Sequence, residues 1–206
     1  MRASALCIFP LVAACAGTHS HQPVKAEGAD LAEFDRVSVV GSLDVQVEVG
    51  AAPSVALKGA RHDLEHLSLV VTDGTLEISK TGDHRMHDVE IRVTTPQLRG
   101  AVLSGSGDIT VSGVSADAFE AELRGSGDID VQGTAKSVSV SVRGSGDVDT
   151  SGLKATSAGV RLSGSGDAHV HATKDATGTL RGSGDIVVGG GATCSIEVAG
   201  SGDVSC

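Results

Sequence analysis

The 206-residue sequence contains no tryptophan, no tyrosine and only three phenylalanines. It therefore lacks most of the ring surfaces on which sugars and nucleic-acid bases stack. It also has no run of basic residues. Its 26 Asp and Glu outnumber its 16 Lys and Arg, so the formal charge is −10. Nucleic-acid binding needs a footprint of Lys and Arg, so we expect no nucleic-acid partner.

The sequence has no apolar run long enough to cross a bilayer as a helix. The stretch Ala5–Ala14, which follows Arg2, is short and typical of a signal-peptide core. It ends in Val-Ala-Ala-Cys, which resembles a bacterial lipobox, where small residues precede a cysteine that receives a lipid. We expect residues 1–14 to be a lipoprotein signal peptide and Cys15 to be lipidated, with ordinary secretion as the alternative.

Residues 15–33 have no sustained apolar period and are expected to form a lipidated tether ahead of a domain at 34–206. Each buried methylene of an acyl chain contributes about 0.8 kcal/mol of membrane affinity, so lipids on Cys15 would hold the protein on a membrane. The next residue, Ala16, is compatible with sorting to the outer membrane. We therefore expect an outer-membrane lipoprotein of the bacterial cell envelope, on the periplasmic or the surface face.

Glycine, in contrast, is abundant, with 28 residues, and much of it lies in a repeated tetrad, Gly-Ser-Gly-Asp. Successive tetrads begin 20, 19, 20, 18 and 18 residues apart. A short and nearly regular period of this kind indicates a stack of similar structural units. The tetrads begin at Gly105, Gly125, Gly144, Gly164, Gly182 and Gly200.

Apolar residues occupy fixed positions around each tetrad. The positions five before, one after and three after the tetrad Asp are almost all aliphatic, as in Leu123, Ile129 and Val131, and polar residues separate them. This alternation predicts strands with one buried face. We therefore predict an all-β protein, a β-solenoid (parallel β-helix-like) with about six short coils of 18–20 residues that share one core.

The tetrad is predicted to form the corner of each coil, because glycine permits positive φ or close backbone approach, and Ser and Asp can hydrogen-bond in a bend. Stacked carboxylates about 4.8 Å apart would repel by roughly 0.9 kcal/mol per pair in water, so a calcium column is an alternative to this structural role. Arg124, Arg143 and Arg181 lie at the same corner and could offset the charge. The predicted turn residues are Asp108, Asp128, Asp147, Asp167, Asp185 and Asp203.

Residues 34–100 continue the alternation less regularly and are expected to form further strands that precede the coils. Two of these strands should flank a turn at Thr72-Asp73-Gly74, and another should cover residues 89–98. Residues 61–67 are expected to form a short helical turn.

Several motifs from Phe34 onward occur in an order known from one protein family. Phe34 with "VSVVGSLDVQVEVG", then "GTLEIS", "VTTPQL" and the "GSGDI" repeats resemble the head GIN domain family of auto-transporter adhesins over residues 34–206. The resemblance implies a parallel β-helix-like domain that is often lipid-anchored in the bacterial envelope. It implies no catalytic residue.

Of the four cysteines, Cys7 would leave with the signal peptide and Cys15 would carry lipid. Cys194 and Cys206 remain, both at predicted inward positions of the last coil. Because an exported protein meets oxidising conditions, we expect a Cys194–Cys206 disulfide that holds the end of the stack, with two buried thiols as the alternative.

The sequence contains no recognisable catalytic constellation. The tetrad serine lacks the Gly-x-Ser-x-Gly spacing of a nucleophile elbow, and no helix follows the glycines as it does in a dinucleotide-binding loop. The histidines do not form a metal-ligand pattern. We therefore expect no catalytic residue, no metal and no cofactor.

The leading hypothesis is a non-enzymatic cell-envelope lipoprotein whose β-solenoid serves interaction, adhesion or scaffolding. Its expected partners are the membrane, through lipidated Cys15, and an envelope protein or polysaccharide. One alternative is a polysaccharide-active enzyme of the pectin-lyase type, although the short, uniform coils lack the long loop insertions common in such enzymes. The other alternative is a calcium-binding structural module.

Overall fold

The computed structural model describes residues 32–82 and 89–206. The predicted signal peptide, Cys15 and nearly all of the predicted tether fall within residues 1–31, outside the described residues. The regular secondary structure of the described chain is almost entirely β-strand, with one short helix. The prediction of an all-β protein is therefore confirmed.

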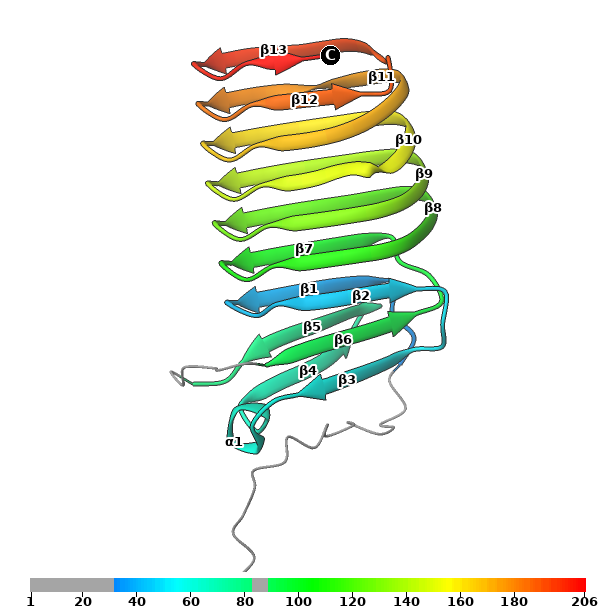
Figure 1. The fold of residues 1–206 in the computed structure, drawn as a ribbon, viewed down its shortest axis with the longest axis vertical. Helices are drawn as coiled ribbons and strands as arrows, with labels where there is room; N and C mark the ends of the chain where they lie inside the picture. The colour runs from blue at the N-terminus through cyan, green and yellow to red at the C-terminus, as the bar shows by residue number, and fades with distance from the viewer. Residues whose placement is uncertain (1–31, 83–88) are drawn as a thin grey trace, which may run out of the picture.

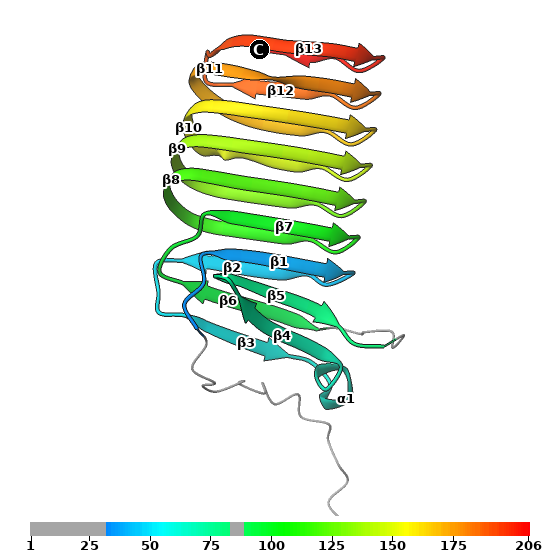
Figure 2. The same cartoon turned by 180° about the vertical axis from the view of Figure 1, so that it is seen from behind.

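After residue 100 the chain winds into a stack of flattened coils (Figures 1 and 2). Adjacent coils pair in parallel and in register, so that Gly125 lies opposite both Gly105 and Gly144. The tetrads thus line up at one edge of the stack, and the predicted β-solenoid is confirmed. The strands are β7 (Gly100–Gly105), β8 (Ile109–Gly125), β9 (Ile129–Gly144), β10 (Val148–Gly164), β11 (Ala168–Gly182), β12 (Ile186–Gly189), β13 (Thr193–Gly200) and β14 (Val204–Ser205).

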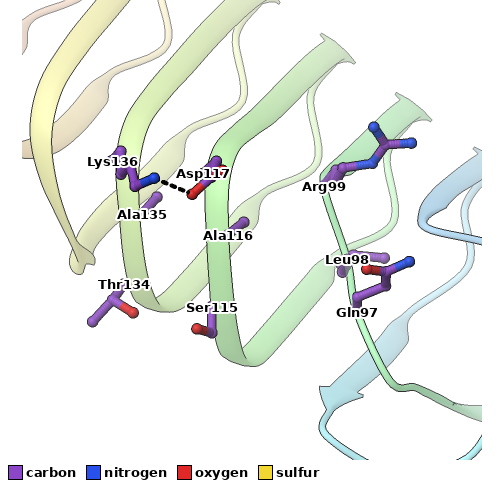
Figure 3. A pocket seen from close by; sticks show the side chains of 9 residues that line it. All are labelled: Gln97, Leu98, Arg99, Ser115, Ala116, Asp117, Thr134, Ala135 and Lys136. Carbon is purple, nitrogen blue, oxygen red and sulfur yellow. Dashed lines mark ion pairs between the residues drawn. The ribbon is translucent and has the colours of Figure 1, made fainter.

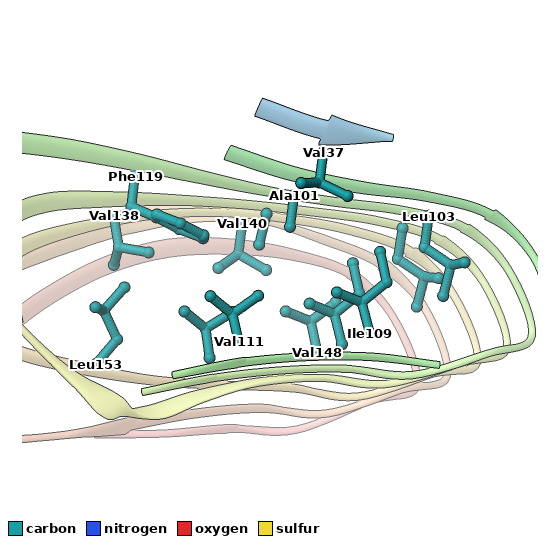
Figure 4. Close-up of a cluster of buried hydrophobic side chains, with 14 of the residues drawn as sticks. Val37, Ala101, Leu103, Ile109, Val111, Phe119, Val138, Val140, Val148 and Leu153 are labelled. Atoms are coloured by element: carbon teal, nitrogen blue, oxygen red, sulfur yellow. The ribbon is translucent and has the colours of Figure 1, made fainter. Parts of the chain in front are cut away.

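Aliphatic side chains from the two faces of each coil meet in the interior of the stack (Figure 4). The position five before the tetrad Asp is buried in coil after coil, and Leu123 and Leu162 are 0% and 1% exposed. The equivalent residue of β13, Val198, is 49% exposed, because no described strand packs over it. The core is therefore one continuous column of side chains, which no single coil could form alone.

One coil inside the stack is formed by the beginning of the domain. Strand β1 pairs in parallel with both β5 and β7, and β2 pairs in parallel with both β6 and β8. The chain thus forms β1 and β2, leaves the stack, returns on one side of them as β5 and β6, and crosses to the other side as β7 (Figure 1). The bounds are β1 (Arg36–Gly41), β2 (Val45–Val49), β5 (Thr75–Lys80) and β6 (Glu90–Thr95).

Two antiparallel strands cover the end of the stack beside β5 and β6. Strand β3 (Ser54–Lys58) pairs with β6, and β4 (Leu67–Thr72) pairs with β5 through a tight turn in which Asp73 and Gly74 have φ of 50° and 73°. The predicted hairpin and the predicted strand near residues 89–98 are therefore confirmed. The predicted helical turn is α1 (Arg61–Leu64), which lies between β3 and β4.

A small ion-pair cluster joins this cap to the stack. Lys58 Nζ lies 3.1 Å from Glu90 Oε2, and Arg92 Nε lies 2.8 Å from Glu90 Oε1. The hydrogen bond from Lys58, followed by that from Arg92, lowers the pKa of the Glu90 carboxyl. A capping element of this kind ends the parallel pairing of a solenoid.

Candidate functional site

The tetrad aspartates form a hydrogen-bonded ladder along one edge of the stack. The carboxylate Oδ1 of Asp128 accepts the backbone N–H of Asp147 at 2.9 Å, and Oδ1 of Asp147 accepts the N–H of Asp167 at 2.7 Å. The same bond joins every adjacent pair from Asp108 to Asp203, at 2.7–3.0 Å. The carboxylates therefore link the backbone of each coil to the next.

The ladder extends one step further than the tetrads do. The carboxylate of Asp44 accepts the N–H of Asp108 at 3.1 Å. Residues 41–44 read Gly-Ser-Leu-Asp, so this corner differs from the tetrad only at Leu43. Sequence reasoning missed Asp44 as a corner residue, and a tetrad search that tolerates one substitution would have found it.

Two of the three arginines near the corner contact a glutamate and not the ladder. Arg124 Nη2 and Arg143 Nη1 both lie close to Glu122 Oε1, at 2.7 and 2.9 Å. Within the described ranges, none of Arg124, Arg143 and Arg181 forms an ion pair with a tetrad aspartate. These arginines therefore do not offset the aspartate charges through direct ion pairs.

We expect Asp147→Ala to lower the free energy of unfolding by about 1–2 kcal/mol, because the N–H of Asp167 loses a charge-assisted acceptor. Asp203→Ala is the matched control, since among the described residues no further corner donates an N–H to the Asp203 carboxylate. Urea unfolding followed by circular dichroism measures both variants.

Equal losses in Asp147→Ala and Asp203→Ala would show that the ladder bond does not stabilise the stack. Unfolding curves recorded again with added EDTA test whether calcium stabilises the fold. Bound calcium would stabilise the fold by mass action, whereas a ladder of N–H bonds leaves the curves unchanged by the chelator.

A shallow groove of about 570 Å³ lies at the opposite edge, where the coils bend (Figure 3). It lies between residues 97–99, which lead into β7, and the bends of β8 and β9. Lys136 Nζ lies 2.7 Å from Asp117 Oδ1, and Arg99 is paired with Asp35. The groove offers hydrogen bonds but no nucleophile with an adjacent base. It is lined by Gln97, Leu98, Arg99, Ser115, Ala116, Asp117, Thr134, Ala135 and Lys136.

A second depression, of about 190 Å³, lies on the outer face of β9, β10 and β11. Three arginines and three hydroxyl side chains surround it, and we call this group the arginine patch. Sequence reasoning noted two of the arginines but missed Arg161, which lies two positions further from the tetrad than the others. The arginine patch consists of Arg143, Arg161, Arg181, Ser141, Ser163 and Thr179.

The other outer face carries two aspartates, one on β9 and one on β10. Asp130 and Asp149 lie opposite each other in the register of β9 and β10. Gln132 Nε2 donates to Asp130 at 3.2 Å, and the Ser151 N–H donates to Asp149 at 2.8 Å. On β9 and β10 the two outer faces therefore differ in charge, with Arg143 and Arg161 on one face and Asp130 and Asp149 on the other.

The predicted pair of cysteines is joined in the structure by a disulfide between Cys194 and Cys206. Cys194 lies in β13 and is partly buried, whereas Cys206 follows β14 and is exposed. The bridge closes a separation of 12 residues and ties the last coil to itself.

The described residues contain no cluster of three or more His, Cys, Asp or Glu that could hold a metal ion. None of their buried side-chain nitrogen or oxygen atoms lacks a hydrogen-bond partner. In the same part of the chain, no helix has the length and apolar character needed to cross a membrane. These features define a β-solenoid domain in which the groups available to a ligand lie on the polar outer surfaces.

The chain belongs to the head GIN domain family. A family model described as "Putative auto-transporter adhesin, head GIN domain" matches residues 33–192. A comparison with curated proteins finds no match.

Solved structures share the fold. A "putative adhesin" from Bacteroides fragilis is 22% identical, with a TM-score of 0.69, and the match covers 85% of this chain and 93% of that one. A "putative adhesin" from Parabacteroides distasonis is 21% identical, with a TM-score of 0.58 and coverage of 90% and 95%. A "putative lipid binding protein" from the same species is 21% identical, with a TM-score of 0.54 and coverage of 92% and 97%.

Proposed function

We propose that this chain is a lipid-anchored, non-catalytic binding protein of the bacterial cell envelope, with an adhesion-like role at the outer membrane. The observation that carries the proposal is the aspartate ladder. The most regular polar motif of the sequence serves backbone pairing between coils, because Oδ1 of each of these carboxylates accepts an N–H of the next coil. The remaining polar side chains lie on flat outer faces.

The arrangement of the chain suits presentation of a surface. Parallel coils in register make a stiff rod, and the cap of β3, α1 and β4 ends the parallel pairing at the side where the domain begins (Figure 2). A tether from Cys15 would then join the rod to the membrane and leave both outer faces accessible to a partner. The family description and the names of the structural neighbours support an adhesion-like role.

The name of one structural neighbour refers to lipid binding. In this chain aliphatic side chains fill the interior between the two faces, and charged side chains are among those that line both the groove and the arginine patch. We therefore propose that contact with lipid is made by acyl chains on Cys15 and not by a cavity within the solenoid.

Metabolic labelling tests the anchor. Cells that express the full chain are grown with an alkyne-bearing fatty acid, and the purified protein is examined for the label. We expect label in the wild-type protein and none in Cys15→Ser, which should also leave the membrane fraction. Absence of label from the wild-type protein would favour ordinary secretion.

Biotinylation of intact cells with a membrane-impermeant reagent tests the adhesion-like role. The domain carries exposed lysines, including Lys154 and Lys174, so a protein on the cell surface should be labelled. Labelling only after cell lysis would place the protein on the periplasmic face and would contradict adhesion.

A further inference from the structure

The arginine patch gathers positive charge on the surface of an acidic protein. The chain has a formal charge of −10, yet three guanidinium groups project from three consecutive strands and no carboxylate lines the depression between them. A local reversal of charge attracts ligands of opposite sign and raises their rate of association.

Most of the donors of these arginines are available to a ligand. Within residues 32–82 and 89–206, neither Arg161 nor Arg181 forms an ion pair or a side-chain hydrogen bond. Arg143 makes a single contact, with Glu122 at 2.9 Å. Because a guanidinium group carries five N–H donors, Arg143 keeps most of its capacity.

The solenoid fixes the spacing of the patch. Ser163 lies opposite Arg143 on one side and opposite Arg181 on the other, so the two arginines are two strand spacings apart, or roughly 9–10 Å. Arg161 lies two residues before Ser163 on the same face of β10. The backbone positions are held by parallel pairing, so a ligand that matches the spacing loses little free energy to ordering of the protein.

An anionic sugar polymer matches the chemistry of this surface. The fork of an arginine forms paired hydrogen bonds with a carboxylate, and the hydroxyls of Ser141, Ser163 and Thr179 can exchange hydrogen bonds with sugar hydroxyls. The patch has no aromatic ring for base stacking and few cations, which disfavours nucleic acid. It also has no exposed aromatic or aliphatic anchor of the kind that dominates protein interfaces.

We propose that the outer face of β9, β10 and β11 binds a carboxylated polysaccharide through Arg143, Arg161 and Arg181. The polymer runs across the strands, so that successive carboxylates meet successive arginines. This inference rests on the proposed function, because it names the class of ligand that the binding surface takes.

Affinity electrophoresis of the purified full-length protein tests the inference. Native gels contain either polygalacturonate, which carries one carboxylate per sugar, or neutral dextran. We expect retardation by polygalacturonate that falls as salt is added, and no retardation by dextran. Arg161→Gln with Arg181→Gln should weaken binding about tenfold, since each exposed charge pair contributes modestly.

The matched control is Lys154→Gln with Lys174→Gln, which removes the same charge from exposed side chains outside the patch. This variant should bind as the wild-type protein does. Replacement of both arginines by Lys should recover only part of the affinity, because an ammonium group lacks the paired donors of arginine.

Four outcomes would overturn the inference: no retardation by polygalacturonate, equal retardation by dextran, equal weakening in the two double variants, or arginine-dependent retardation by double-stranded DNA in its place. Fatty-acid labelling and intact-cell biotinylation do not involve these arginines. A failure of the ligand assignment is therefore distinguishable from a failure of the proposed function.

Discussion

Gly144→Ala should destabilise the protein by about 3 kcal/mol or more, with loss of soluble, folded material at 37 °C. Gly144 has φ of 140°, and a Cβ on it would lie 2.0 Å from the backbone oxygen of Gly125 in the preceding coil. That oxygen cannot retreat at low cost, because it accepts the N–H of Ser145 at 2.9 Å. Strain within the residue and steric overlap between coils therefore add.

Gly159→Ala is the control for this variant. Gly159 lies in β10 without a positive φ, and a Cβ there would meet no atom within 4 Å. The substitution should be neutral or stabilise the fold by about 0.5 kcal/mol, since it removes backbone freedom from the unfolded chain. Thermal and urea unfolding of the two variants make the comparison. Similar curves for Gly144→Ala and the wild-type protein would contradict close packing of the corners.

Leu162→Ala should lower the free energy of unfolding by about 3 kcal/mol. Leu162 is 1% exposed and lies in register between Val142 and Leu180, both 0% exposed. Loss of its isobutyl group removes buried apolar area and leaves a cavity in the middle of the column. Because the neighbouring coils are pinned by strand pairing on both sides, they can close this cavity only in part.

Val198→Ala is the control, because Val198 holds the same position in β13 but is 49% exposed. Its truncation should cost less than about 1 kcal/mol. Urea unfolding measures both variants under the same conditions. Equal losses would show that stacking between coils does not bury the column.

Most of the stack could be predicted before any coordinates, because its signals are local. Each tetrad repeats one corner, and the aliphatic positions around it, such as Leu123 and Ile129, identify the buried face of every coil. Glycine at the corner also predicts the close approach that is observed between Gly125 and Gly144.

The partner of each tetrad carboxylate could not be predicted in this way. A carboxylate in a bend can accept an N–H of its own turn or one from another segment, and both choices look alike in the sequence. The oxygen of Asp147 reaches the N–H of Asp167, 20 residues away, because the stack places the two corners one strand spacing apart. The arginine patch arises likewise, since Arg143, Arg161 and Arg181 become neighbours only when the coils stack.

Periodicity alone was thus enough to establish strands, corners and a shared aliphatic core, because these depend on spacing within a single coil. The place of β1 and β2 between β5, β6 and β7, β8 was decided by the tertiary structure. Alternation identifies which face of a strand is buried, whereas the choice of neighbour depends on which edges of otherwise similar strands meet and complete their hydrogen bonds.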